Sequence, residues 1–191
     1  MYYPNNMTFQ YFFFDTYLGN SLQILPIVLS VGIIYGWVKY RKDHNTPFRQ
    51  RIGAILFVCY ITGLICLVWL FGVIGEVWYR MLYHMDSGRN IGFFDLNLRA
   101  NFVPDFFTDM DREGYANVML FLPFGVLYPF YKQDASWKRT VCAGSVSSII
   151  IETMQPLFGR AFDINDIILN IIGVLISATV FYMIKRVFKN K

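Results

Sequence analysis

Long apolar stretches are the feature that most constrains this chain. Five windows approach the roughly 20 apolar residues that a helix needs to cross a bilayer. We expect membrane spans at about residues 21–38, 52–78, 115–131, 140–158 and 165–184. The composition agrees, because 55% of the residues are hydrophobic and only 16% are charged, which is unusual for a soluble domain. The sequence therefore predicts an all-α, polytopic membrane protein with about five transmembrane helices.

The positions of Lys and Arg predict the orientation of these spans. Most of the 17 basic residues lie in three segments, 39–51, 132–139 and 185–191, which fall on the same side of five alternating spans. The positive-inside rule places this side in the cytoplasm, with the N-terminus outside and the C-terminus inside. The long loop 80–114 then lies outside, and we expect it to cover the outer end of the bundle. The net charge of +4 reflects this topology and is not evidence for nucleic-acid binding.

The last two predicted spans each carry polar residues along one helical face. The two sets are Ser145, Ser148, Glu152 and Gln155, and then Asp163, Asp166, Asn170, Gly173 and Ser177. Carboxylates and amides are costly in lipid, so they usually face a protein interior or a wet cavity. Asn117, near the outer end of the third span, and Arg160, between the last two spans, complete the set. This pattern predicts a polar site that opens to the outer side of the membrane.

Several of these residues also have structural explanations, which the sequence leaves open. Glu152 could pair with Arg160 and only fix the helical hairpin. Asp163 could cap a helix, since acids are favoured at a helix start. Asn170 could form an interhelical hydrogen bond. Pro123 could kink the third span or interrupt it, and an interrupted helix is tolerated where it lines a cavity.

The order of short motifs in the second half resembles the VanZ-like family of membrane proteins, which is associated with teicoplanin resistance. The matching residues are Asn101-Phe102-Val103-Pro104, Asn117 to Gly125, Ile151 to Gln155, Gly159-Arg160, Asp163, Asp166, Asn170 and Gly173. The resemblance covers roughly residues 99–182. It implies a multi-pass protein of the bacterial cell membrane that is linked to tolerance of glycopeptide or lipoglycopeptide antibiotics. The abundance of Ile, Phe, Lys and Asn suits a Gram-positive source.

The expected organisation has three parts. Residues 1–98 hold an N-terminal interfacial segment, two spans and part of the outer loop. Residues 99–184 form the VanZ-like region with three spans, and residues 185–191 form a basic cytoplasmic tail.

The sequence supports three classes of function. In the first, the outer site binds an envelope lipid, a lipid-linked cell-wall precursor or a lipoglycopeptide antibiotic. Arg160 would hold an anion, because guanidinium matches phosphate geometry. The other candidate ligand-binding residues are Arg99, Asn101, Asn117, Gln155, Asp163 and Asn170.

In the second class, an intramembrane enzyme modifies an envelope lipid or a glycopeptide. Glu152 would act as general acid or base, with Asp166 as a second catalytic candidate. Asp163 and Asp166 could hold a divalent cation, since hard cations prefer oxygen ligands. The sequence leaves the cofactor unknown. The third class is a proton-coupled transporter with Glu152 as the proton carrier. Few polar residues lie between Glu152 and the cytoplasmic ends of the last two spans, which disfavours this class.

Overall fold

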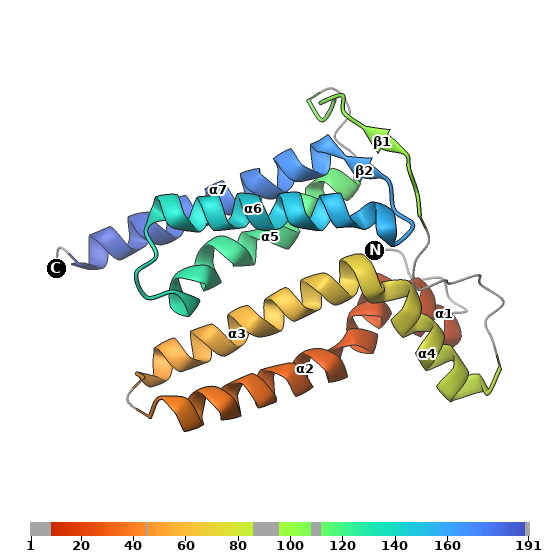
Figure 1. The fold of residues 1–191 in the computed structure, drawn as a ribbon, viewed down its shortest axis with the longest axis horizontal. Helices are drawn as coiled ribbons and strands as arrows, with labels where there is room; N and C mark the ends of the chain where they lie inside the picture. The colour runs from red at the N-terminus through yellow and green to blue at the C-terminus, as the bar shows by residue number, and fades with distance from the viewer. Residues whose placement is uncertain (1–8, 45, 86–95, 108–111, 190–191) are drawn as a thin grey trace.

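The N-terminal part of the chain forms an antiparallel helix pair. In the computed structural model, which describes residues 9–44, 46–85, 96–107 and 112–189, α1 (Phe9–Asp15) leads into α2 (Tyr17–Lys42), and α3 (Phe48–Ile65) returns beside it (Figure 1). Thr16 caps α2, since its Oγ1 accepts a hydrogen bond from the Gly19 N–H at 3.1 Å.

The second apolar stretch is bent, whereas the sequence predicted one tilted span over residues 52–78. A π-helical turn, Cys66–Leu70, follows α3, and α4 (Phe71–Tyr83) then turns away from the direction of α3 (Figure 1). Helices bend sharply where a π-turn interrupts the regular hydrogen bonding. The new direction packs α4 on α1, where the rings of Phe13 and Trp78 meet edge to face with centroids 5.6 Å apart.

The C-terminal part consists of α5 (Arg112–Tyr131), α6 (Trp137–Met154) and α7 (Ile164–Lys189). α5 runs without a break through Pro123 and Pro129, so the alternative of an interrupted third span is wrong. The Ser136 hydroxyl caps α6 by accepting from the Arg139 N–H. A 3-10 turn, Gln155–Leu157, ends this helix a few residues earlier than the sequence predicted.

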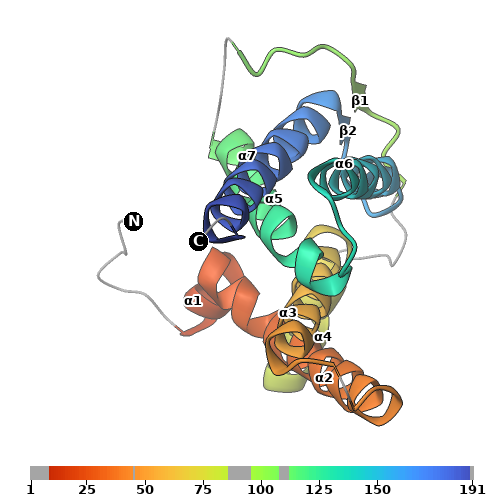
Figure 2. The same cartoon turned by 90° about the vertical axis from the view of Figure 1, so that its left-hand side faces the viewer.

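Two glycines bring α5 and α7 into backbone contact. A Cβ placed on Gly173 would overlap the carbonyl oxygen of Val118, and one on Gly125 would lie 2.5 Å from the Ala178 nitrogen. Small residues allow membrane helices to approach this closely. Phe121, Phe124 and Val174 are fully buried in the core beside this contact, and α5 also packs on α3. Viewed from the left-hand side of Figure 1, α2 and α3 form one group and α5, α6 and α7 a second (Figure 2).

Part of the outer loop lies against the turn between α6 and α7. Strand β1 (Ala100–Asn101) pairs in parallel with β2 (Phe162–Asp163), with Asn101 opposite Asp163. The sequence did not predict this pairing, although it did place the loop over the outer end of the bundle. Residues 86–95 and 108–111 of the loop lie outside the described part of the chain.

Three helical segments within the described residues are long and apolar enough to cross a membrane. They are Leu18–Lys42, Phe48–Tyr83 and Ile164–Phe188. α5 and α6 run alongside them, and the count of five spans stays a prediction. Many large apolar side chains face outward, among them Ile33 at 71% exposure, as expected for helices that contact lipid. The described parts of the three basic segments, residues 39–44, 46–51, 132–139 and 185–189, gather at one end of the bundle (Figure 1).

Candidate functional site

Glu152 is buried near the C-terminal end of α6, where it is 1% exposed. Its Oε1 accepts a hydrogen bond from Nε2 of Gln155 at 2.5 Å. Trp69, from the π-turn, secures this end of α6, because its indole N–H donates to the Ile151 carbonyl at 3.3 Å and its ring stacks on Phe158. The carboxyl of Glu152 therefore lies inside the protein, as the sequence predicted for an acid on this helical face.

Asn117 and Asp166 join α5 to α7 next to this carboxyl. The Asn117 Nδ2 donates to Oδ1 of Asp166 at 2.5 Å. Asp166 lies in the first turn of α7, where the helix dipole favours a negative charge. Asp166, Asp163 and Arg160 all interact electrostatically with Glu152. The structure thus joins Glu152 to Gln155 and Asn117 to Asp166, with Asp166 near enough to act on the charge of Glu152.

The alternative in which Glu152 pairs with Arg160 is not formed within the described part of the chain. The Arg160 side chain is exposed, and its positive charge acts on the Glu152 carboxyl without direct contact. Buried carboxylates are usually paired or hydrogen-bonded, since an isolated charge is costly to bury. The hairpin is fixed instead by backbone contacts, such as the Arg160 N–H bonding to the Gln155 carbonyl at 3.3 Å.

Three buried acceptors in this region lack a hydrogen-bond donor among the described residues. They are Oε2 of Glu152, Oε1 of Gln155 and Oδ1 of Asn170. The interhelical hydrogen bond expected for Asn170 is therefore not formed through its oxygen. Nearly all buried polar atoms in proteins are satisfied by protein, water or ligand. A proton on Oε2 of Glu152 would satisfy that oxygen and at most one of the other two acceptors, so the third needs another donor.

A pocket of about 330 Å³ opens on the other side of Asn117. Its polar lining residues are Asn20, Ser21, Asn117 and Arg160. Its apolar lining comes from the π-turn, α4 and α5, with Leu67, Val68, Phe71, Ala116 and Leu120. The Oδ1 of Asn20 is also buried without a partner among the described atoms. Asn117 therefore lines the pocket and also donates to Asp166.

Asn20 and Ser21 were not among the residues that sequence reasoning selected. The available signal was two consecutive polar residues at the outer end of the first span. Their meeting with Asn117 in one pocket depends on how the α2–α3 pair and the π-turn are arranged beside α5, which no local pattern in the sequence specifies.

Three of the predicted site residues hold the outer loop in place. The Asn101 Nδ2 donates to both carboxylate oxygens of Asp163, at 3.3 and 3.4 Å. The Arg99 carbonyl accepts from the Phe162 N–H, while the Arg99 side chain is exposed and lies outside the pocket. Asp163 Oδ1 also accepts from the Asn165 N–H at 2.8 Å, which caps α7. The carboxylate of Asp163 thus accepts hydrogen bonds from amide N–H groups of the protein.

Asn165 is the central anchor of this loop, and sequence reasoning missed it. Its Oδ1 accepts from the N–H groups of Asp105 and Phe106, and its Nδ2 donates to Asp105, Asp163 and the Val103 carbonyl. The side chain is 8% exposed. Within the described residues, no group of three or more Asp, Glu, His or Cys side chains could hold a metal ion.

Comparison with known proteins identifies the family. A family model described as VanZ/LLP1 matches residues 57–186. The chain belongs to the VanZ/LLP1 family. The match begins within α3, further toward the N-terminus than the motifs of the sequence resemblance, and it includes every predicted residue of the polar cluster. Searches of the curated proteins and of the solved structures found no match.

Proposed function

We propose that this VanZ/LLP1 protein binds an anionic, amide-bearing envelope ligand in the pocket between α2 and α5, and that binding contributes to glycopeptide resistance, including resistance to teicoplanin. The ligand would be an envelope lipid, a lipid-linked cell-wall precursor or a lipoglycopeptide antibiotic. The observation that carries this proposal is the shared lining of one pocket by Arg160 and Asn117.

The pocket offers complementary groups for such a ligand. Arg160 supplies a cation whose planar donors fit phosphate or carboxylate oxygens. Asn117, Asn20 and Ser21 supply hydrogen-bonding groups suited to amides and sugars. Phe71 and the other apolar lining residues offer a surface for a lipid tail. This pairing of a few polar groups with apolar walls is typical of small-molecule sites.

The location also favours an envelope ligand. The pocket is lined from the starts of α2 and α5, and these helix ends lie opposite to the described parts of the three basic segments (Figure 1). By the positive-inside rule, that end faces the outside of a bacterial cell membrane. A Gram-positive envelope exposes cell-wall precursors and lipid headgroups on this side, within reach of Arg160.

Arg160→Ala is expected to weaken ligand binding at least about tenfold, because a hydrogen bond to a charged group contributes about 1.5–3 kcal/mol. In a susceptible Gram-positive host, the wild type should raise the inhibitory concentration of teicoplanin. Arg160→Ala should remove most of that increase at equal membrane levels, which immunoblotting of the membrane fraction verifies.

Arg80→Ala is the matched control for this measurement. Arg80 is an exposed arginine at the end of α4, pairs with Glu76 at 3.0 Å, and does not line the pocket. It should leave resistance unchanged. Equal resistance from wild type and Arg160→Ala would remove the pocket from the proposal, and no protection from the wild type would direct attention to native envelope lipids as ligands.

A second candidate is an intramembrane enzyme that uses Glu152 as general acid or base. It is favoured by the burial of this carboxyl and by its Oε2, which lacks a donor among the described residues. Glu152 does not line the pocket, so a substrate bound there would need further access to reach its carboxyl. The binding function needs no such access and is therefore preferred.

Glu152→Gln separates the two candidates. Glutamine keeps an oxygen that can accept from Gln155, so the fold should be retained. The affinity for the ligand should change by less than about threefold. An acid–base mechanism loses about 10²–10⁴-fold in rate when its proton-transfer group is removed. Turnover of a radiolabelled envelope lipid by wild-type membranes, abolished in Glu152→Gln, would support catalysis, and full resistance from Glu152→Gln would support binding.

A further inference from the structure

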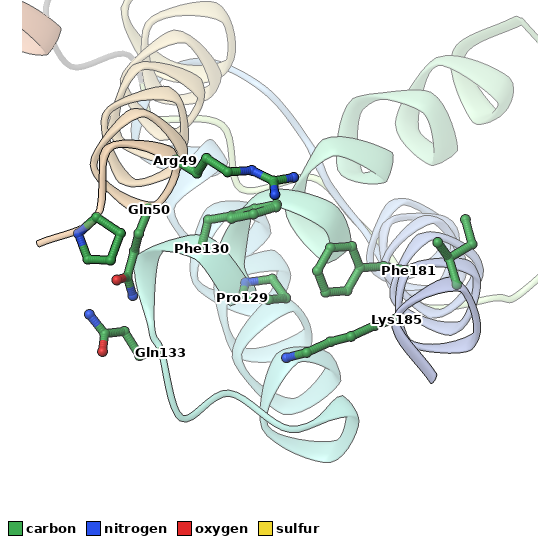
Figure 3. Close-up of a pocket in the computed structure, with 9 residues that line it drawn as sticks. Arg49, Gln50, Pro129, Phe130, Gln133, Phe181 and Lys185 are labelled. Atoms are coloured by element: carbon green, nitrogen blue, oxygen red, sulfur yellow. The ribbon is translucent and has the colours of Figure 1, made fainter. Parts of the chain in front are cut away.

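A second cavity lies at the basic end of the bundle, away from the polar cluster. It has a volume of about 510 Å³ and lies between the start of α3, the end of α5 and the end of α7. Pro129, Phe130 and Phe181 form an apolar floor (Figure 3). None of the lining residues is acidic.

Two cations border this floor from different helices. Arg49 extends from α3 across Phe130, and Lys185 extends from α7 beside Phe181 (Figure 3). Within the described residues, neither side chain forms an ion pair. Gln133 adds a hydrogen-bonding amide at the edge. The cavity is therefore positively charged at its mouth and apolar below.

The cavity continues as an apolar groove along α3. A neighbouring hollow of about 280 Å³ shares Arg49 and Phe130 with it and is lined further by Ile52, Leu56 and Leu127. Arg49 and Leu56 are seven residues apart, so the groove follows α3 for about 10 Å at 1.5 Å per residue. Ile52 and Leu56 are partly exposed, as surfaces that contact lipid are.

We propose that this composite groove is a binding site for an anionic phospholipid. Arg49 and Lys185 hold the headgroup phosphate, and one acyl chain follows the groove past Ile52 and Leu56. Basic pockets between transmembrane helices on the cytoplasmic side are suited to acidic lipid headgroups. The distribution of Lys and Arg places this end in the cytoplasmic leaflet. The site is independent of the outer pocket.

Native mass spectrometry of the detergent-solubilised full chain, titrated with dioleoyl phosphatidylglycerol, tests the headgroup contacts. The double variant Arg49→Gln/Lys185→Gln should bind this lipid at least about tenfold more weakly than the wild type. The double variant Lys42→Gln/Arg186→Gln removes the same charge from the same end without touching the groove, and it should bind within about twofold of the wild type. An equal loss in both double variants would show diffuse attraction and overturn the site, as would wild-type affinity in the groove variant.

Two further arms distinguish an anionic lipid from other ligands. Dioleoyl phosphatidylcholine carries the same chains without net charge and should bind more weakly; equal binding would contradict the role of the cations. Inorganic phosphate in millimolar excess should displace little lipid, and complete displacement would identify a phosphate site instead. Leu56→Trp should fill the chain groove and weaken phosphatidylglycerol binding, whereas Leu29→Trp, at an exposed position of α2, should not. Wild-type affinity in Leu56→Trp would rule out the acyl-chain track.

Discussion

Gly173→Ala is expected to lower the stability of the whole bundle by about 3 kcal/mol, at the upper end of the usual cost of overpacking. The added methyl group would overlap the carbonyl oxygen of Val118 and lie 3.2 Å from its carbon. These are backbone atoms of α5, so no side-chain rotation can relieve the contact, and α5 must move away from α7. In a thermal unfolding measurement on purified protein, the midpoint should fall by about 6–12 °C.

The control for this substitution is Gly63→Ala on α3. The nearest atoms to its new methyl group, in Val28 and Ile24, lie 3.7 and 4.0 Å away, which is ordinary contact. Alanine also has a higher helix propensity than glycine. The melting temperature should therefore stay level or rise. If the Gly173→Ala variant unfolded at the same temperature as the wild type, α5 and α7 would not be packed backbone to backbone.

Asn165→Ala is expected to release the outer loop from the start of α7. The substitution removes the hydrogen bonds to Val103, Asp105, Phe106 and Asp163, and it leaves several of these groups unsatisfied. Each lost bond costs about 0.5–1.5 kcal/mol, so the loop should be destabilised by about 2–4 kcal/mol. Limited proteolysis from the outer side should then cleave near residues 103–106 at least about tenfold faster than in the wild type.

Thr153→Ala is a suitable comparison, because Thr153 is exposed near the C-terminal end of α6, beside the turn that leads to Asn165. Its hydroxyl bonds only to the Ile149 carbonyl of its own helix. The cleavage rate should therefore match that of the wild type. Identical proteolysis of Asn165→Ala would mean that β1–β2 pairing alone secures the loop.

The helices and the polar helical faces were largely predictable from the sequence. A helix in lipid satisfies its own backbone, so the apolar windows largely coincide with α2, α3, α5, α6 and α7. The three-residue spacing of Glu152 and Gln155 predicted that both side chains share one face, because residues three or four apart do so on a helix. Both are buried at the end of α6 and in the 3-10 turn that follows. The meeting of Asn117 with Asp166 also followed from their predicted depth.

The remaining features depend on contacts between distant segments. Nothing local distinguishes residues 66–70 from the apolar sequence around them, so the bend before α4 could not be located. The hydrogen bond between Asn101 and Asp163 was not predicted, because both residues had been interpreted as ligand-binding residues. Asn165 looked like the first residue of a span, and its role appears only when the loop is folded over it.

The glycine contact between α5 and α7 has a mechanical consequence. It fixes α5 against α7, while Phe57 and Phe124 pack α3 against the other side of α5, with ring centroids 5.4 Å apart. One wall of the pocket with Arg160 comes from α5, through Ala116, Asn117 and Leu120. Moving α5 to widen this pocket would unpack the core on both of its sides, so the wall that carries Asn117 stays fixed when a ligand binds.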